Sequence, residues 1–341
     1  MSRNHRIIVP TVFAAVVLLA PTASLADDAP EVTANNYVRA ESDFQMKTYI
    51  EQMDNFGRLV HNRKPYDVDK QITVRGNRDT LYSFGIFDLA SPLTVILPDS
   101  GDRYQSLMIV NQDHSIAAAY GPKEVKLTQE IVGTRYVLLA IRTFMDPGIE
   151  ADVKAAHQLQ DKVVTSQADK GKFEVPDWNR EEIEKMRATI NVLAATVSDT
   201  SKMFGIEDEL DPVYHKLGAA LGWGGLPSTA AMYVNVFPEK NDGKVAYTLT
   251  VKDVPVDAFW SVTLYDAEGW MPKNEYQAYS FNSVTARKNK DGSTTIHFGG
   301  DSKQPNYFPL VEGWNYIVRL YRPRKELLEG KWAFPEPVEA K

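Results

Sequence analysis

The amino-acid sequence predicts a mainly β protein of the α+β class, in which helices join two modules of antiparallel strands. Short runs of β-branched and aromatic residues recur about every ten residues in two separate blocks, with turn-forming residues between the runs. The stretch between the blocks has apolar residues at helical spacing instead. Strands and helices do not alternate within either block, as a parallel sheet would require. On these patterns alone, each block is an antiparallel sandwich or a barrel.

The first 26 residues have the features of an export signal. Arg3 and Arg6 give a positive start, residues 7–20 form an apolar run, and residues 24–26 place small side chains where a signal peptidase cleaves. The apolar run is too short to span a bilayer. We therefore expect cleavage near Ala26, a periplasmic protein and no stable membrane insertion.

Composition limits the size and the chemistry of the mature chain. Removal of the export signal leaves 315 of the 341 residues and changes the formal charge from −7 to −9, because two arginines are lost. This length favours two domains, and a hydrophobic content of 43% is sufficient for a packed core. The absence of cysteine excludes disulfides, thiol catalysis and iron–sulfur clusters. The acidic balance argues against nucleic acid as a partner.

The first block follows an N-terminal helix. Residues 33–60 have apolar side chains at helical spacing, and Pro65 prevents continuation of the helix. We expect an N-terminal helical segment at 27–60 and a first β module at 61–146. The strand-like runs in this module are Ile72–Val74, Thr80–Phe87, Leu93–Leu97, Tyr104–Val110, Ser115–Ala119 and Tyr136–Ile141.

A helical connector is expected over residues 147–221, and it contains three helices. Residues 149–164 form the first. Asn179, which two glutamates follow closely, suits the start of the second helix, whose apolar face extends to Val197. The third helix covers residues 211–221 and has a proline in its first turn.

The second block is expected to form a β module at residues 222–325. Asn241–Gly243 has the composition of a hairpin turn and predicts pairing of the first two strands, and Lys290–Gly292 predicts a hairpin between the fourth and the fifth. Residues 326–341 are rich in proline and charge, which predicts a loosely packed tail. The strand-like runs are Ala231–Phe237, Val245–Val251, Phe259–Tyr265, Ser280–Thr285, Thr294–Phe298 and Trp314–Tyr321.

Several kinds of chemistry lack their sequence signatures. The chain contains no Gly-x-Ser-x-Gly nucleophile elbow and no P-loop. The glycine-rich stretch at 218–225 follows a helix rather than a strand, which is the wrong context for a dinucleotide site. The five histidines of the mature chain do not have metal-ligand spacing. Local sequence therefore predicts no cofactor and no metal, and a metal held by dispersed residues stays open.

Asn77, Arg78, Asp79 and Tyr82 form the densest polar cluster beside a predicted strand. In a binding site, Arg78 would hold an anion through its two-pronged guanidinium, and Asp79 would orient the ligand or act as a base. In a structural role, Asp79 would pair with an arginine and cap the turn before the strand. Both interpretations stay open.

Asp113 and His114 follow the strand-like run at 104–110. A histidine beside a carboxylate can act as a general base, so the candidate catalytic residues are Asp79, Asp113 and His114. Neighbouring residues on an extended chain point to opposite sides, so the pair cooperates only if a turn brings them together. A polar turn without a catalytic role is the alternative.

Arginines and aromatic residues supply the other candidates. Arg135 opens one strand-like run, and Arg319 occupies the polar side of another, where it must meet water, a carboxylate or a ligand. Aromatic side chains, which are abundant in the second block, stack on flat ligands such as sugar rings when exposed and fill the core when buried. The candidate ligand-binding residues are Asn77, Arg78, Tyr82, Arg135, Trp260, Tyr265, Trp270 and Arg319.

Longer motifs carry a resemblance to a known family. In the first module they are Arg75–Tyr82 (RGNRDTLY), Asp88-Leu89, Leu97–Asp99 (LPD) and Gly101–Leu107 (GDRYQSL). In the second they are Tyr247–Leu249 (YTL), Val256–Asp266 (VDAFWSVTLYD), Asp291–Ser293 (DGS) and Arg319–Tyr321 (RLY). The chain thus resembles the paired domains of unknown function numbered 1254, on the N-terminal side, and 1214, on the C-terminal side. The resemblance implies a jelly-roll-like β-sandwich for each module and no particular reaction. The first module is shorter than the family pattern between residues 122 and 135.

Three functions fit these observations, and whether the protein is an enzyme stays open. The first is binding of a small organic acid or a glycan in a cleft of the two-sandwich fold, because arginines and aromatic residues are abundant and no recognisable catalytic set occurs. The second is a hydrolase or lyase that uses Asp79, Asp113 and His114 as acid–base groups. The third is a structural protein that forms a homo-oligomer through the apolar faces of its connector helices.

Overall fold

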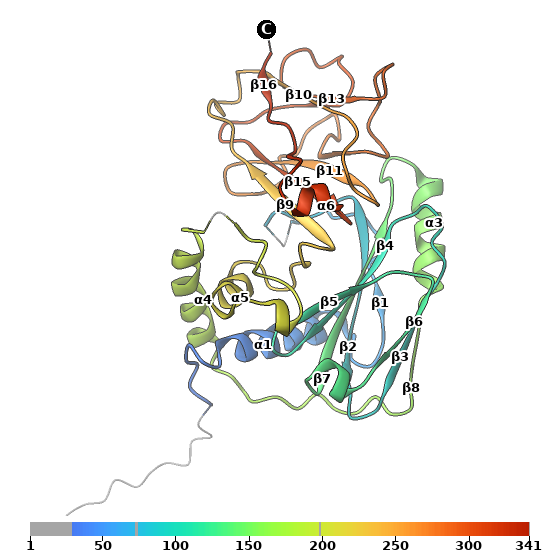
Figure 1. Ribbon diagram of the computed structural model, residues 1–341, viewed down its shortest axis with the longest axis vertical. Helices are drawn as coiled ribbons and strands as arrows, with labels where there is room; N and C mark the ends of the chain where they lie inside the picture. Colours follow the sequence, from blue (N-terminus) through green and yellow to red (C-terminus); the bar gives the residue numbers. More distant parts are fainter. Residues whose placement is uncertain (1–28, 72–73, 198, 341) are drawn as a thin grey trace, which may run out of the picture.

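The chain folds into two β modules that lie one above the other, with a group of helices beside the first module (Figure 1). The computed structural model describes residues 29–71, 74–197 and 199–340. The expected export signal lies outside these residues, as does most of the expected strand at 72–74. The described chain is mainly β and most of its strand pairs are antiparallel, as the sequence predicts. No helix in this part of the chain is both long and apolar enough to cross a membrane.

The first module consists of two sheets that share a core. Sheet A has the strand order β1-β2-β7-β4-β5, and sheet B has the order β6-β3-β8. One face of sheet A packs with sheet B around Val95, Leu107 and Leu139. The strands are β1 (Val60–His61), β2 (Thr80–Asp88), β3 (Leu93–Leu97), β4 (Gln105–Asn111), β5 (Ile116–Ala119), β6 (Lys123–Leu127), β7 (Tyr136–Phe144) and β8 (Val164–Gln167).

The second module also has two sheets around one core. Sheet C has the order β12-β11-β15-β9, and sheet D has the order β14-β13-β10-β16, in which β13 and β14 are parallel. Trp314, Phe298 and Val318 lie in the core between them. The strands are β9 (Ala231–Val236), β10 (Tyr247–Val251), β11 (Trp260–Tyr265), β12 (Ser280–Asn282), β13 (Thr294–Phe298), β14 (Tyr307–Phe308), β15 (Asn315–Tyr321) and β16 (Val338–Glu339).

Three helices pack against one another beside sheet A (Figure 1). They are α1 (Tyr37–Met53), α4 (Arg180–Ala194) and α5 (Pro212–Leu221). The side chain of Asn179 accepts hydrogen bonds from the first backbone N–H groups of α4, as predicted. The remaining helices are α2 (Gln129–Val132), α3 (Glu150–Asp161), α6 (Lys325–Leu328) and a 3₁₀ turn (Glu207–Glu209).

The prediction of two hairpins in the second module is wrong. β9 and β10, which Asn241–Gly243 connects, belong to different sheets, and so do β12 and β13. Lys290–Gly292 does form a tight turn beside a bridge between Lys288 and Thr294. The error has a physical reason: both β9 and β10 bury alternate side chains in the same core, and this pattern fits two facing sheets as well as a hairpin.

The expectation of a loosely packed tail is also wrong. Leu327 and Phe334 are buried in the core of the second module, and β16 pairs with β10. Three apolar side chains in this segment, at positions 327, 332 and 334, cover the core edge and explain its docking. The C-terminal segment is therefore part of the second module.

Sheet A and sheet C meet at the interface between the modules. Tyr104 and Phe144 from sheet A pack with Phe259 and Tyr321 from the second module. Alternation along β15 sends its even-numbered side chains into the core of the second module and its odd-numbered ones, including Arg319, toward the first.

Candidate functional site

Polar side chains gather where sheet A faces sheet C. Tyr82 on β2 and Arg142 on β7 are direct partners across sheet A. Tyr233 on β9 and Arg319 on β15 are direct partners across sheet C. We call the following residues the interdomain cluster: Asn77, Asp79, Tyr82, Arg142, Tyr233, Arg319 and Tyr321.

Asn77 joins the two modules within this cluster. Its Nδ2 donates to the hydroxyl oxygen of Tyr82 at 3.3 Å and to that of Tyr321 at 3.0 Å. Its Oδ1 accepts from the backbone N–H of Asp79 at 2.9 Å, which forms the turn before β2. The same amide thus shapes the turn and holds two phenols of different modules beside each other.

Asp79 is 2% exposed and is held by the second module. One carboxylate oxygen accepts from the hydroxyl of Ser280 at 2.8 Å and from Nδ2 of Asn282 at 3.0 Å. The other oxygen is buried and has no hydrogen-bond partner among the described residues. The predicted turn role of Asp79 is seen. The predicted pairing with an arginine is not seen, since Arg78 instead donates to the backbone oxygen of Tyr66.

Arg319 is buried and its hydrogen bonds are well satisfied. It donates to the hydroxyls of Thr263 at 2.9 Å and Tyr265 at 2.7 Å, and to the backbone oxygens of Arg75 at 2.9 Å and Gly76 at 3.3 Å. Burial works to lower its pKa, but the neighbouring phenols raise the pKa above its ordinary value, so Arg319 is a cation. Its role is to fix the loop before Asn77 on sheet C.

Arg142 is 8% exposed and has no anionic partner. Its one hydrogen-bond acceptor in the described structure is the sulfur of Met108 at 3.6 Å, and no described carboxylate lies within ion-pair distance. Burial acts to lower its pKa, but the phenols of Tyr82, Tyr233 and other tyrosines raise it above the ordinary value. A buried guanidinium without a carboxylate partner is unusual, because desolvation of its charge is unfavourable.

The tyrosines around Arg142 differ in their ionisation. Burial raises the pKa of Tyr82, but Arg142 and the hydrogen bond from Asn77 outweigh it and hold the pKa below its ordinary value. Burial raises the pKa of Tyr233, and that of Tyr321 well above the ordinary value. Arg142 is the direct partner of Tyr82 in the sheet and lies over its ring, so its positive charge favours the deprotonated form of Tyr82.

The aromatic side chains near Arg142 are less completely buried than Arg142 itself. Tyr82, Phe84 and Tyr233 are each partly buried. A cavity of about 440 Å³ lies beside the cluster, and Tyr104 and Phe259 in its wall contact the ring of Tyr321. The rings of Tyr104 and Phe259 thus lie between this cavity and the cluster.

Asp113 and His114 do not join this cluster. Asp113 is on the surface and forms a bidentate ion pair with Arg39, with N–O distances of 2.8 and 2.6 Å. His114 is fully buried, accepts from the backbone N–H of Gly224 at 2.9 Å and stacks on His215 at 5.6 Å. The side chains of the three candidate catalytic residues Asp79, Asp113 and His114 thus occupy three different environments, and none of the hydrogen bonds described above joins them.

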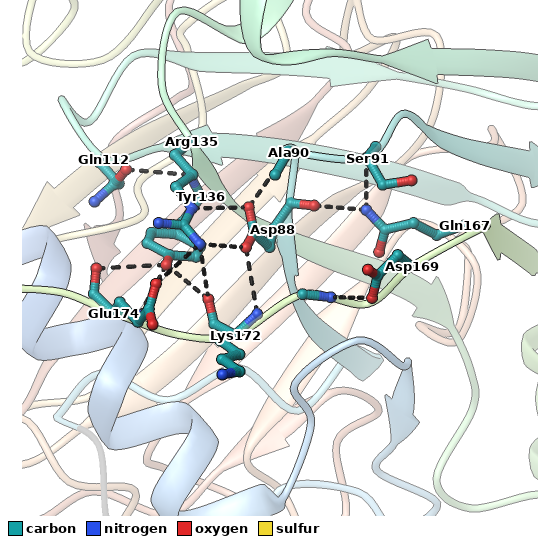
Figure 2. Close-up of polar contacts among 11 residues, drawn as sticks. Asp88, Ala90, Ser91, Gln112, Arg135, Tyr136, Gln167, Asp169, Lys172 and Glu174 are labelled. Carbon is teal, nitrogen blue, oxygen red and sulfur yellow. Dashed lines mark hydrogen bonds and ion pairs between the residues drawn. The ribbon is translucent and has the colours of Figure 1, made fainter.

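Arg135 belongs to a separate network (Figure 2). Its guanidinium binds both oxygens of the buried Asp88, at 3.0 and 2.8 Å, and also contacts Glu174. Asp88 also accepts from the backbone N–H groups of Ala90 and Lys172. This network attaches the extended segment after β8 to the end of β2 and the start of β7 in sheet A.

The other candidate ligand-binding residues are also dispersed. Arg78 lies over the ring of Tyr279 at 5.3 Å. Trp260 is buried in the core of the second module against Phe334, on the face of β11 opposite the cluster. Trp270 is partly buried in the turn after β11. Tyr265 adjoins the cluster through Arg319 and donates to the backbone oxygen of Gly76 at 2.6 Å.

Sequence reasoning predicted Asn77, Asp79, Tyr82, Tyr265 and Arg319, and the structure places these side chains together. It missed Arg142, Tyr233 and Tyr321. A signal for Arg142 was present, because it is the single charged residue in the nine-residue strand β7, all of which is buried. The two tyrosines carried no comparable signal, since they stood among many aromatic residues of the second block.

The cluster contains guanidinium, amide and phenol hydrogen-bond donors, but it has few metal ligands. Within the described ranges, no group of three or more histidine, aspartate or glutamate side chains could hold a metal ion. The cluster itself contains one carboxylate, Asp79. Its chemistry is that of a cation surrounded by phenols.

Comparisons with known proteins agree with this two-module arrangement. Residues 56–127 match the family model described as protein of unknown function DUF1254, and residues 231–325 match the one described as protein of unknown function DUF1214. The resemblance predicted from the motifs is confirmed, in the predicted order. No curated protein matches the chain.

Two solved structures are similar to this chain. The crystal structure of the VPA0106 protein from Vibrio parahaemolyticus is 21% identical, has a TM-score of 0.68 and covers 90% of this chain and 98% of its own. A putative uncharacterized protein from Burkholderia cenocepacia is 14% identical, with a TM-score of 0.47 and coverage of 88% and 89%. At this identity the first likeness shows the fold alone.

Proposed function

We propose that the protein binds a small organic acid at the interdomain cluster, with the carboxylate of the ligand on Arg142. The observation that carries this proposal is the buried guanidinium of Arg142, which has no carboxylate partner among the described residues. Arginine binds carboxylates through two parallel hydrogen bonds, and the interaction is strong where water is scarce. When Tyr82 is protonated, a ligand anion would supply the counter-charge that Arg142 lacks.

The surroundings of Arg142 support a ligand of modest size with an apolar or flat part. Tyr82 and Phe84 stack at 5.5 Å, and Tyr49 packs on Phe84 at 4.9 Å. These rings offer apolar surface, while the hydroxyls of Tyr82 and Tyr233 offer hydrogen bonds. Ligand sites commonly combine apolar walls with a few polar groups in this way.

Thermal unfolding in the presence of small molecules tests the proposal. The panel is acetate, pyruvate, succinate, benzoate and, as a neutral sugar, glucose. At about 100 times its Kd, a ligand adds about 2.7 kcal/mol to the free energy of unfolding, which is a readily measured rise in Tm. We expect a rise with at least one carboxylate for the wild type and for Arg58→Gln, which alters an exposed ion pair, and none for Arg142→Gln.

Two outcomes would contradict the proposal. An equal rise in Tm for the wild type and for Arg142→Gln would place the carboxylate elsewhere. A rise with glucose and with none of the carboxylates would favour a glycan ligand instead.

We propose in addition that binding takes place in the periplasm. The support is the composition of residues 1–26, which is typical of an export signal. N-terminal sequencing of the protein from a periplasmic extract is expected to begin near Asp27. A chain that retains its first residues and stays in the cytoplasmic fraction would overturn this part.

A further inference from the structure

Two phenols of different modules meet on one amide in the interdomain cluster. Nδ2 of Asn77 donates to the hydroxyl oxygens of Tyr82 and Tyr321, at 3.3 and 3.0 Å. Because both oxygens accept from the same nitrogen, they lie next to each other. Tyr82 also stands directly opposite Arg142 in the sheet, so the unpaired cation is adjacent to the phenol pair.

The two phenols experience opposite environments. Arg142 and the Asn77 amide hold the pKa of Tyr82 below its ordinary value, despite its burial. Burial holds the pKa of Tyr321 well above its ordinary value. Tyr82 is thus the phenol that can lose its proton, and Tyr321 is the phenol that keeps its proton and can donate a hydrogen bond. Neighbouring groups whose pKa values are separated by their environments are typical of acid–base catalysis.

The cluster also contains hydrogen-bond donors that can stabilise an oxyanion as it forms. Donors that are already in place around a buried site stabilise negative charge in a transition state, because they need not reorganise during the reaction. Here the donors are the Arg142 guanidinium and the Tyr321 hydroxyl. Arg319 is committed to Thr263, Tyr265 and the loop before Asn77, and it adds positive charge nearby without needing to move.

On this geometry, and resting on the proposed function, we propose that the interdomain cluster catalyses proton transfer at C3 of a small 2-oxo acid, with Tyr82 as the base. The carboxylate of the substrate binds Arg142, and its carbonyl oxygen accepts a hydrogen bond from Tyr321. The class of substrate follows from the cluster: a carboxylate for the cation, and an adjacent carbonyl whose enolate can use the donors.

The proton transfer from C3 to Tyr82 needs no further reactant. The phenolate oxygen of Tyr82 takes a proton from C3, so the C3–H bond breaks and the O–H bond of Tyr82 forms. The electron pair of the C3–H bond becomes the C2–C3 double bond, and the carbonyl π pair moves to oxygen to give an enolate beside Tyr321. Return of the proton from Tyr82 to C3 regenerates the 2-oxo acid. In heavy water Tyr82 exchanges its proton with the solvent, so C3 acquires deuterium.

Proton NMR in heavy water tests the inference with the full-length mature chain. The probes are pyruvate, 2-oxobutyrate and 2-oxoglutarate, and the measurement is the loss of the C3 proton signal above the buffer rate. We expect the wild type to accelerate exchange of at least one probe. Tyr82→Phe should lower the enzymatic rate by about 100-fold or more, since a general base contributes 10²–10⁴-fold. Tyr321→Phe should lower it by about 100-fold, as loss of an oxyanion donor does.

The matched control is Tyr276→Phe, which removes the hydroxyl of an exposed tyrosine outside the cluster and should leave exchange unchanged. Thermal unfolding with the same probes separates this inference from the proposed function. Tyr82→Phe should keep the rise in Tm with the active probe, whereas Arg142→Gln should lose both the rise in Tm and the exchange.

Three results would overturn the inference. If the probes raise the Tm but none exchanges, the binding function stands and the catalytic inference fails. If the probes neither raise the Tm nor exchange their C3 protons, the catalytic inference fails. The effect of the other carboxylates of the panel on the Tm then tests the binding function separately. If Tyr82→Phe exchanges as fast as the wild type, Tyr82 is not the base.

Discussion

Tyr82 and Arg142 lie directly opposite each other on β2 and β7, and the guanidinium carbon of Arg142 lies 5.3 Å from the centroid of the Tyr82 ring. A face of an aromatic ring attracts a cation, but it does not replace a counter-charge. As long as Tyr82 keeps its proton, the pair therefore leaves the positive charge of Arg142 uncompensated between the two modules. This relationship connects the stability of the protein to the ligand that we propose.

Replacement of Arg142 by methionine is expected to stabilise the ligand-free protein. The change removes a buried charge that has no carboxylate partner and keeps most of the volume of the side chain, and such changes raise the free energy of unfolding by about 1–3 kcal/mol. Urea unfolding of the mature protein without added carboxylate measures the effect. A decrease of more than about 1 kcal/mol would show that Arg142 is satisfied in the free protein and would weaken the binding proposal.

Replacement of Arg319 by methionine is expected to have the opposite effect. Four acceptors lose the hydrogen bonds that Arg319 donates, and of these the backbone oxygen of Gly76 keeps a second donor, the hydroxyl of Tyr265. Breaking a buried polar network of this kind lowers the free energy of unfolding by about 3–5 kcal/mol. Urea unfolding under the conditions used for the Arg142 variant provides the comparison. Equal changes in the free energy of unfolding for the two arginine variants would contradict the conclusion that Arg319 has its hydrogen-bond partners and Arg142 does not.

Replacement of Asp88 by alanine is expected to release the segment that the network of Figure 2 holds. The buried carboxylate binds Arg135 and two backbone N–H groups, so its loss is expected to lower the free energy of unfolding by about 2–4 kcal/mol. Hydrogen exchange should become faster at the backbone amides of Ala90 and Lys172. The control is Asp113→Ala, which alters an exposed ion pair with Arg39 and should change stability by less than about 1 kcal/mol. Unchanged protection of both amides in Asp88→Ala would refute the role of the network.

Acid is expected to destabilise the protein through His114. Burial lowers the pKa of this histidine to about 3, with a smaller contribution from His215, against an unfolded value of about 6.5. The unfolded chain therefore binds more protons between these two values, and stability is lost as the pH falls below about 6.5. Between pH 7.5 and pH 5 the loss from His114 is about 2 kcal/mol.

Urea unfolding at the two pH values measures this loss. His114→Gln should show a smaller decrease between pH 7.5 and pH 5 than the wild type, even if its stability at pH 7.5 is lower. His157→Gln, which changes a partly buried histidine bonded to the backbone of Arg63, serves as the control. A decrease in His114→Gln as large as that of the wild type would assign the acid sensitivity to other groups.

Local features of the sequence predicted local structure well. The boundaries of β3 and β13 coincide with the predicted runs, and Asn179 caps α4 as expected. These features depend on alternation, turn residues and capping, which act over a few neighbouring residues. The same alternation placed Arg319 on the side of its strand away from the apolar core. The placement of β9 and β10 in different sheets could not be predicted in this way, because two facing sheets and a hairpin bury the same side chains.

By itself, the sequence determined the mainly β class, the order of the modules and several of the side chains that form the cluster. Only the tertiary structure decided that Asn77 meets Tyr321, which lies 244 positions further along the chain. It also decided that Asp113 pairs with Arg39, whereas His114 accepts from Gly224. It also decided that Arg142 has no carboxylate beside it. The physical reason is that periodicity and turn chemistry act along the chain, whereas the counter-charge of a buried group depends on which faces of distant sheets pack together.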